Sequence, residues 1–549
     1  YSALSSVSGT TFALIKSETQ TTEEMLEELA KRPEVLAASP NYIQHLNRTE
    51  PNDPYFLDGA LWGMEAIRAP EAWDVTSGDE TVYVAVIDTG SDTDHEDLKG
   101  NLNKDLSRNF VAENDGEKAD PEAFEDGQGH GTHVAGTIGA VGDNGTGVVG
   151  VNWKVGLIAL RVMNNEGRGS ANDIIAALNY LVGLLKAEPD LKLAAVNYSG
   201  GGWSPETPEE ARLTPMYLAY KALNDMDRAV IVTSAGNDGL EIGAPAPFDD
   251  PVMIEGEEGP KPRESFKQGD YIYPKSYLGL DNMIVVGAIA PEGEAADFSN
   301  WSETKVDLAA PGVDIYSTVP PLPEIISEGS YISGDCGGYT SWLGTSMAAP
   351  HVAGAVALLA ARYPEKTPSE LKAYLLEFAS ADVNPVPQPV LFFPYKEYYE
   401  YSNSVQKLSR RGLLDVKAAL DALGDPDVKF YPITAAAEGG GRVEPSGAVW
   451  VRGGKAQTFT FIQDSGYSLH DVKVDDGSVL RDIKSVDGNL QYTFSNVGEE
   501  HTLSAYFVKI PPTPKYMPGS SGGGCDAGFG AIATFAILGA VLLRRKEEN

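Results

Sequence analysis

The sequence predicts an α/β protein built on a doubly wound parallel sheet with helices on both faces, and two observations support this fold class. Continuous apolar runs rich in β-branched residues, such as Val82–Ile87 and Ala229–Val232, are typical of strands buried on both faces. Amphipathic helical segments alternate with such runs. The helix expected after Ser346 has an apolar stripe made of Val352, Ala355, Val356, Leu358 and Leu359.

Three polar segments fall where this fold would bring them to a site. Asp88 directly follows the strand 82–87, at the carboxyl edge of the sheet, where α/β proteins place their sites. The segment Gly129–Gly136 opens a helix with small residues around two histidines. Ser346 lies at the start of an apolar helix, beside backbone N–H groups that would stabilise an oxyanion.

An acid, a base and a serine are the groups that acyl transfer needs. Each also has a simpler interpretation: Asp88 as a turn residue at a strand end, His133 as a satisfied helical histidine, and Ser346 as a helix N-cap. The three occur together, which favours a shared chemical role.

The segments Asp88–Gly90, His130–His133 and Gly344–Pro350, in this order, resemble the three signature blocks of the subtilisin family of serine proteases. The resemblance implies that Asp88 orients the base, His133 is the general base and acid, and Ser346 is the nucleophile. It implies a serine endopeptidase acting on proteins or peptides, with no cofactor for the chemistry. The alternative is a catalytically silent, surface-anchored binding protein.

Two further segments match the family. By the resemblance, Asn237 supplies a side-chain donor to the oxyanion hole, together with the backbone N–H of the nucleophile; a turn is the alternative for Asn237. Ser199, Gly200 and Gly201 follow a segment that resembles the family's edge strand, so they are predicted to bind extended substrate by β-augmentation. A plain glycine-rich turn is the alternative for these three.

A structural calcium ion is expected from two loops that resemble a calcium site of the family. Asp97 matches an aspartate ligand, and the loop Asp143–Val148 resembles one that supplies an asparagine oxygen and backbone carbonyls. Asp97 and Asn144 are therefore the candidate side-chain ligands. A hydrogen-bonded surface loop is the alternative, because the family's N-terminal ligand cannot be located from the sequence.

The composition fits an exported protein. The formal net charge of −37 and a pI near 4.5 argue against nucleic acid and anionic membrane surfaces as partners. Cys336 and Cys525 are the only cysteines, so no disulfide framework is expected.

The 549 residues divide into five predicted regions. Residues 1–50 resemble part of an inhibitory propeptide, and residues 51–425 form the catalytic domain. Short alternating runs between turn residues predict a β-sandwich over residues 426–510, acting as a spacer or a binding module. A Pro/Gly/Ser-rich linker covers residues 511–524, and a sorting or transmembrane tail covers residues 525–549.

The N-terminal region is predicted to contain a strand at Thr11–Lys16, a helix at Thr22–Lys31 and a strand at Val35–Ile43. The chain starts at Tyr1 without a methionine, so we expect a truncated precursor whose own propeptide acts as an intramolecular partner; a permanent N-terminal α/β decoration is the alternative. Self-cleavage is expected within His45–Pro51.

The tail combines Cys525, a short apolar run to Leu543 and the basic cluster Arg544–Lys546. This pattern resembles tripartite bacterial sorting signals of the SYNERG-CTERM class, which implies processing near Cys525 by a sorting protease. A plain transmembrane anchor is the alternative. Both interpretations predict export to a bacterial cell envelope, with attachment to the membrane through the C-terminal helix.

Overall fold

The computed structural model describes only part of the chain. The described residues are 2–7, 10–14, 17, 21–38, 49–113, 118–247, 249, 253–254, 261–262, 267–273, 280–321, 324–327, 330–333, 337–380, 408–486 and 488–511. Cys336, most of the predicted linker 511–524 and the predicted tail with Cys525 lie outside them, as do residues 45–48 of the predicted self-cleavage segment. Within the described residues, no helix is long and apolar enough to cross a membrane.

The predicted parallel sheet is confirmed. Seven strands pair in the order β13-β12-β8-β6-β3-β5-β4, and every neighbouring pair is parallel. In chain order these strands are β3 (Gly78–Asp88), β4 (Arg108–Asn109), β5 (Lys154–Arg161), β6 (Lys192–Tyr198), β8 (Val230–Ser234), β12 (Met283–Ile289) and β13 (Leu308–Pro311).

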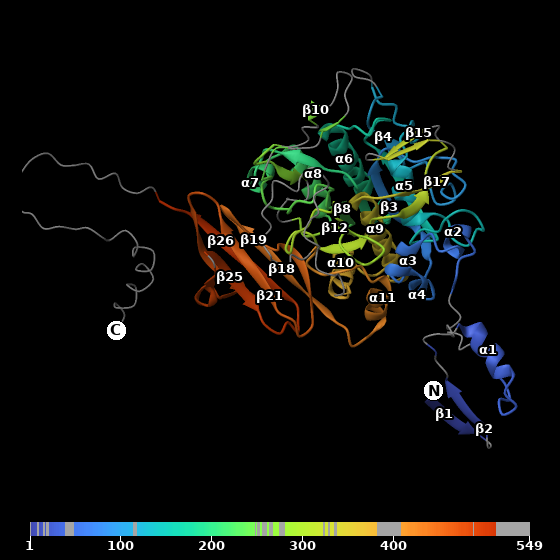
Figure 1. Ribbon diagram of the computed structural model, residues 1–549. Coiled ribbons are helices and arrows are strands. Elements are labelled where there is room, and N and C mark those ends of the chain that lie inside the picture. The colour runs from blue at the N-terminus through green and yellow to red at the C-terminus, as the bar shows by residue number, and fades with distance from the viewer. Residues whose placement is uncertain are drawn as a thin grey trace, which may run out of the picture.

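Helices cover both faces of this sheet (Figure 1), because its central strands are apolar on both sides. In β3, Val84 and Val86 join one core cluster, while Ala85 and Ile87 join the other. The first cluster contains residues of α4 (Ala69–Trp73), α5 (His130–Gly139), α9 (Thr345–Arg362), α10 (Pro368–Glu377) and α11 (Val416–Gly424). The second contains residues of α6 (Ala171–Ala187) and α8 (Pro215–Asn224).

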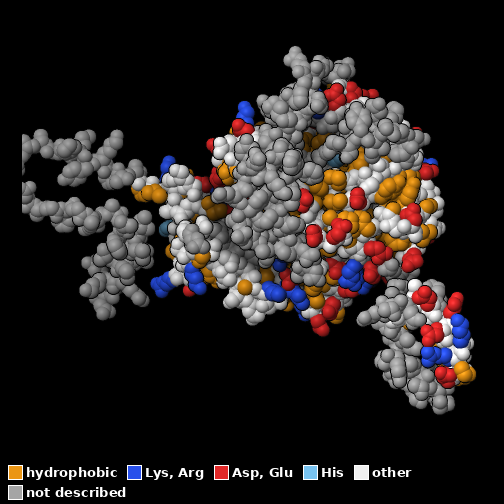
Figure 2. Space-filling view, viewed as in Figure 1, with side chains coloured by type: hydrophobic (Ala, Val, Ile, Leu, Met, Phe, Trp, Pro, Cys, Tyr) orange, Lys and Arg blue, Asp and Glu red, His pale blue; other side chains and the backbone are white. Residues whose placement is uncertain are grey.

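Short elements surround the carboxyl edge of the sheet. An antiparallel pair, β14 (Ile315–Thr318) with β17 (Tyr339–Trp342), precedes α9, and β7 (Gly202–Ser204) pairs with β11 (Tyr271–Tyr273). The remaining short elements are α2 (Pro54–Leu57), α3 (Trp62–Ala66), α7 (Pro208–Ala211), β9 (Met253–Ile254), β10 (Lys261–Pro262), β15 (Glu324–Ser327) and β16 (Ser330–Ser333). On the face seen in Figure 2, acidic side chains are scattered over the body, as expected for a solvated acidic surface.

The N-terminal region contains the antiparallel strands β1 (Ser2–Val7) and β2 (Thr10–Leu14), followed by α1 (Thr22–Ala30). Thr21 caps this helix in a capping box with Glu24, as its sequence indicates. The residues 35–38 of the predicted third segment are not in a strand, and residues 39–43 lie outside the described part.

The C-terminal module consists of two sheets packed around one apolar core. The five-stranded sheet has the order β20-β18-β26-β22-β23, and the four-stranded sheet has the order β19-β21-β25-β24. The elements are β18 (Phe430–Glu438), β19 (Gly441–Glu444), β20 (Gly447–Arg452), β21 (Gln457–Gln463), β22 (Tyr467–Val474), β23 (Gly477–Ser478), the 3-10 helix η2 (Leu480–Asp482), β24 (Lys484–Val486), β25 (Asn489–Phe494) and β26 (His501–Lys509).

This module is docked against the body that contains the parallel sheet. The backbone N–H and the hydroxyl of Ser446 both donate to Asp281, at 2.8 and 2.7 Å. Trp450 donates from Nε1 to Ser369 at the start of α10, at 3.1 Å. A freely hanging spacer would make no such contacts, so the module is a packed part of the molecule.

Candidate active site

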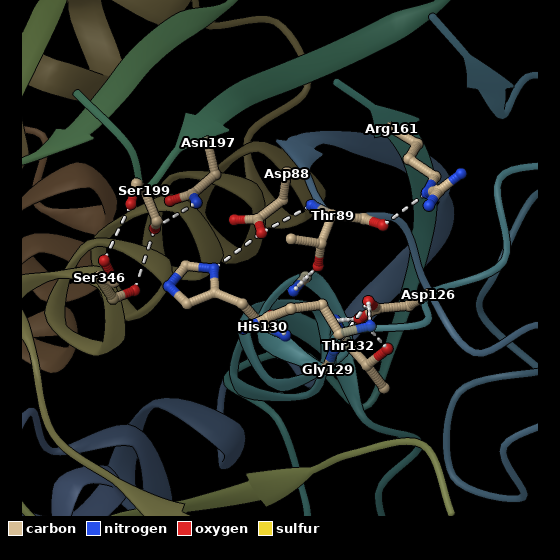
Figure 3. A network of polar contacts seen from close by, with 12 residues as sticks. Asp88, Thr89, Asp126, Gly129, His130, Thr132, Arg161, Asn197, Ser199 and Ser346 are labelled. Carbon is tan, nitrogen blue, oxygen red and sulfur yellow. Dashed lines mark hydrogen bonds and ion pairs between the residues drawn. The ribbon is translucent and has the colours of Figure 1, made fainter. Parts of the chain in front are cut away.

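Asp88 and His130 form an acid–base pair at the carboxyl edge of the sheet. Asp88 ends β3 and is 1% exposed; its Oδ1 lies 2.7 Å from Nδ1 of His130, the first residue of α5. The backbone N–H of Thr89 donates to the same oxygen at 2.8 Å. In Figure 3 the imidazole of His130 lies between Asp88 and Ser346, with its other ring nitrogen turned toward the serine. This order of groups is the one that acyl transfer requires.

The prediction that His133 is the base is wrong. His133 lies one helical turn further along α5, is fully buried and pairs through Nε2 with the backbone oxygen of Ile315, at 2.9 Å. Its ring stacks on Trp342, with centroids 4.9 Å apart and planes at 8°. The two histidines are three residues apart, so they share one side of α5 and the spacing does not distinguish them. Their contacts do: His130 meets the carboxylate of Asp88, and His133 meets the backbone oxygen of Ile315.

Burial makes His133 a source of acid sensitivity. Desolvation, aided by nearby His130, lowers the pKa of His133 from 6.5 to about 3. The unfolded chain therefore binds a proton that the native state excludes, and the free energy of unfolding falls as the pH drops from 6.5 toward 3, by about 1.4 kcal/mol per pH unit for this one group.

Urea unfolding between pH 7 and 4, in a Ser346→Ala background, measures this effect. The free energy of unfolding should fall less steeply with decreasing pH for His133→Gln than for the parent. Equal slopes would contradict this.

The first turn of α5 is held by side chains that reach it from other segments. Asp126, which is 2% exposed, accepts from the backbone N–H of Thr132 at 2.9 Å and from its hydroxyl at 2.6 Å. Thr89 accepts from the backbone N–H of Gly131 at 2.8 Å. Because these N–H groups have no partner inside the helix, the contacts fix the helix start, and with it the backbone of His130 (Figure 3).

Ser346 is the second residue of α9, as predicted. Its hydroxyl donates to the backbone oxygen of Ser199 at 2.8 Å, and the Ser199 hydroxyl donates to the backbone oxygen of Ser346 at 3.0 Å. Asn197 on β6 donates to the Ser199 hydroxyl at 2.9 Å. Ser199, the first of the three residues predicted to bind substrate, directly follows β6 and contacts the serine. The segment before it is not an edge strand, because β6 is a central strand paired with β3 and β8.

Asn237 is fixed beside the start of α9. Its side-chain oxygen accepts from the backbone N–H and the hydroxyl of Thr345, at 2.9 and 2.8 Å. A β-carbon at Gly344 would lie 3.5 Å from Nδ2 of Asn237 and 3.6 Å from the backbone N of Ser346. These two donors therefore line one small space, which stays open because Gly344 has no side chain; its φ of 148° also favours glycine.

The two predicted calcium ligands meet in the structure. Asn144 donates from Nδ2 to Asp97 Oδ1 at 2.7 Å, and the backbone N–H of Val148 donates to Asp97 Oδ2 at 2.8 Å. Asp53, 0% exposed, holds the same loop by accepting from the backbone N–H of Asp143 at 2.7 Å. Asp53 was not among the predicted ligands, although it stands in the polar pair Asn52–Asp53 at the entry to the domain.

The oxygen atoms around this loop suit the coordination of a hard cation such as calcium. Asp53 Oδ1 is buried without a hydrogen-bond partner, and burial, with the charge of Asp97, raises the pKa of Asp53 to about 6. A calcium ion would relieve the repulsion between these carboxylates. Within the described ranges, no three His, Cys, Asp or Glu side chains are grouped to hold a metal ion. Amide and backbone carbonyl oxygens would therefore have to complete the coordination.

Comparisons with known proteins agree with this site. The family model described as Subtilase family, Peptidase S8, matches residues 79–410. An intracellular serine protease of Paenibacillus polymyxa is 36% identical over 297 residues, 54% of this chain and 72% of the relative. Subtilisin DY of Bacillus licheniformis is 32% identical, over 58% of this chain and 91% of its own, and thermitase of Thermoactinomyces vulgaris is 30% identical, over 57% and 86%.

The chain belongs to the subtilase family. It is a subtilisin-like serine endopeptidase, and the alternative of a catalytically silent binding protein is not favoured.

Proposed function

We propose that the protein hydrolyses peptide bonds through an acyl-enzyme on Ser346, with His130 as general base and acid and Asp88 as the group that orients it. The contact between Asp88 Oδ1 and His130 Nδ1, at 2.7 Å, carries this assignment. A carboxylate on Nδ1 holds the imidazole in the tautomer whose other nitrogen can accept the serine proton.

The proposed reaction begins with a rotation of the Ser346 hydroxyl, which donates to Ser199 in the structure. His130 takes the hydroxyl proton as the serine oxygen attacks the scissile carbonyl, and Asp88 stabilises the imidazolium that forms. His130 then protonates the leaving amine, and the acyl-enzyme forms. Water, deprotonated by His130, attacks the acyl group; the bond between the acyl carbon and the Ser346 oxygen then breaks, and His130 returns the proton to that oxygen as the carboxylic acid product leaves.

Active-site labelling tests the proposed function. A fluorophosphonate probe should label the wild type on Ser346 and leave Ser346→Ala unlabelled, and only the wild type should hydrolyse unfolded casein. If the folded wild type neither reacts with the probe nor cleaves casein in the presence of calcium, the result would favour the alternative function, a catalytically silent binding protein.

Asn237 and the backbone N–H of Ser346 are proposed to stabilise the oxyanion of the tetrahedral intermediate. Asn237→Leu is then expected to lower kcat by about 10²–10³-fold with little change in KM, the loss known for the equivalent donor of subtilisin. Thr345→Val, which removes one of the two donors to the Asn237 side-chain oxygen, should cause a smaller fall in kcat. Steady-state kinetics on a peptide substrate measure both. A rise in KM at constant kcat would instead place Asn237 in substrate binding.

Ser199, Gly200 and Gly201 are proposed to pair with the backbone of an extended substrate. Ser199 directly follows β6 and contacts Ser346, and Gly200 and Gly201 continue the chain from it, which supports this role. The pairing uses backbone groups, so it would accept many side chains, and it fits protein substrates in extended, locally unfolded segments.

Calcium is proposed to bind between Asp97, Asn144 and Asp53 as a structural ion. Addition of EDTA is expected to lower the unfolding temperature, because an ion at about 100 times its Kd stabilises the native state by about 2.7 kcal/mol. Asp53→Asn should weaken the response to calcium, whereas Asp94→Asn, an exposed acid nearby, should keep it. Thermal unfolding with and without calcium measures this; identical curves for the wild type would rule out the site.

Export, processing at the N-terminus and anchoring through the tail are proposed from the resemblances of residues 1–50 and 525–549. The mass of the purified protein tests the first processing step: the wild type should lose about 45–50 residues, as for a self-removed prosegment, and Ser346→Ala should keep them. If both proteins retain these N-terminal residues, the propeptide interpretation is wrong, and the proposed protease activity is not affected by that result.

A further inference from the structure

The antiparallel pair β14–β17 connects the helix that carries the base to the helix that carries the nucleophile. β14 lies against α5, and β17 leads through Leu343 into α9. The two strands pair over four residues each, from Ile315 opposite Trp342 to Thr318 opposite Tyr339. We call this pair the bridging ribbon.

Among the hydrogen bonds that attach the bridging ribbon to α5, three involve the first four residues of the helix. His133 pairs through Nε2 with the Ile315 oxygen at 2.9 Å, and the Ser317 hydroxyl donates to the His133 oxygen at 2.7 Å. The Thr318 hydroxyl donates to the Thr132 oxygen at 2.8 Å. Two of these three contacts use His133, which follows His130 by one helical turn.

The same histidine also contacts the strand that leads to the nucleophile. Trp342 is 4% exposed and packs face to face on the His133 ring. It precedes Ser346 by four residues, and the backbone N–H of Gly344 between them donates to Gly312 at 2.8 Å. His133 therefore contacts both strands of the ribbon, through its ring nitrogen on β14 and its ring face on β17.

We propose that His133 is a positioning residue that fixes the base helix relative to the nucleophile segment, through Ile315 and Trp342. This inference rests on the proposed roles of His130 and Ser346. Neutral imidazole suits the task, because it presents one N–H to a carbonyl and a flat face to an indole. A misplacement of about 1 Å between reacting groups is enough to cost about 10²-fold in rate.

Two substitutions separate the two contacts. His133→Gln keeps an amide donor near the position of Nε2 and loses the ring, whereas His133→Phe keeps the ring and loses the donor. Each is expected to lower kcat per active site, counted by fluorophosphonate titration, by about 10–100-fold, with KM within about two-fold. Thr367→Ala, which removes the N-cap of α10, is the control for stability alone: it should lower the unfolding temperature and leave kcat per site unchanged.

Hydrogen exchange gives a readout that does not depend on activity. In a Ser346→Ala background, either His133 variant should speed exchange in peptides that cover residues 342–347 as well as in those of α5. Exchange that rises only in α5, or kcat per titrated site equal to that of the wild type, would overturn the inference and leave His133 as a core residue. An unlabelled, inactive wild type would instead overturn the proposed function, and the exchange experiment would still decide whether His133 couples the two helices.

Discussion

Replacing His130 by alanine is expected to lower kcat by about 10⁶-fold, the loss that removal of the base or the nucleophile causes in subtilisin. The reason is that the His130 imidazole bonds to Asp88 through one ring nitrogen and turns the other toward Ser346 (Figure 3). Without the imidazole, the Ser346 hydroxyl keeps its proton and the leaving amine receives none. Active-site titration followed by kcat on a peptide substrate measures the loss.

The control for His130→Ala is His133→Gln, because the two histidines belong to the same motif and the same helix. The expected losses differ by about four orders of magnitude, since His133 does not touch the reacting atoms. His130→Ala also leaves the buried Asp88 carboxylate without its imidazole partner, so its unfolding temperature is measured beside kcat to establish that the variant is folded. An active His130→Ala together with an inactive, folded His133→Gln would reverse the assignment.

Asp88→Asn is expected to lower kcat by about 10⁴-fold at neutral pH, in line with the loss from removing or neutralising the acid in serine proteases of this mechanism. Asp88 Oδ1 accepts from Thr89 and faces His130 Nδ1, so an asparagine that kept its oxygen there would lose only the charge. An asparagine turned the other way would place an N–H against Nδ1 and favour the wrong tautomer. In both cases the imidazolium of the transition state loses its counter-charge.

The matched control for Asp88→Asn is Asp92→Asn, a neighbouring buried acid whose Oδ1 accepts from the backbone N–H of Asp94 at 3.0 Å. That change should reduce kcat by less than about ten-fold, since a lost turn contact acts on stability rather than on the imidazolium. Assay above pH 9 should recover part of the Asp88→Asn activity if hydroxide replaces His130 as the base. Equal kcat for the two variants would exclude Asp88 as the orienting acid.

The sheet, and the ends of its strands and helices, could be predicted from the sequence because the residue pattern that identifies them is local. Runs such as Val82–Ile87 are apolar at every position, which requires helices on both faces, and the structure confirms the parallel sheet. Asp88 and Ser346 were located for the same reason: one follows a buried strand and the other starts a buried helix, so their place at the carboxyl edge follows from the topology.

The residues around the two histidines do not determine which of them, His130 or His133, is the base. Both lie in one short run of small residues, and no periodicity separates a helix's first residue from its fourth when the flanking residues are glycine, threonine and alanine. Only the packing of α5 against β3 and the bridging ribbon decides which ring faces Asp88 and which faces Ile315.

The sequence by itself therefore determined the fold class, the protease family and the positions of acid and serine, because these depend on burial patterns and on motifs read along the chain. The tertiary structure decided which histidine pairs with Asp88, and that Asp53 joins Asp97 at the loop Asp143–Val148. It also decided that the C-terminal module packs on the body through Asp281 and Ser446. The physical reason is common to these cases: each depends on the direction in which a side chain leaves its element toward a partner far away in the sequence.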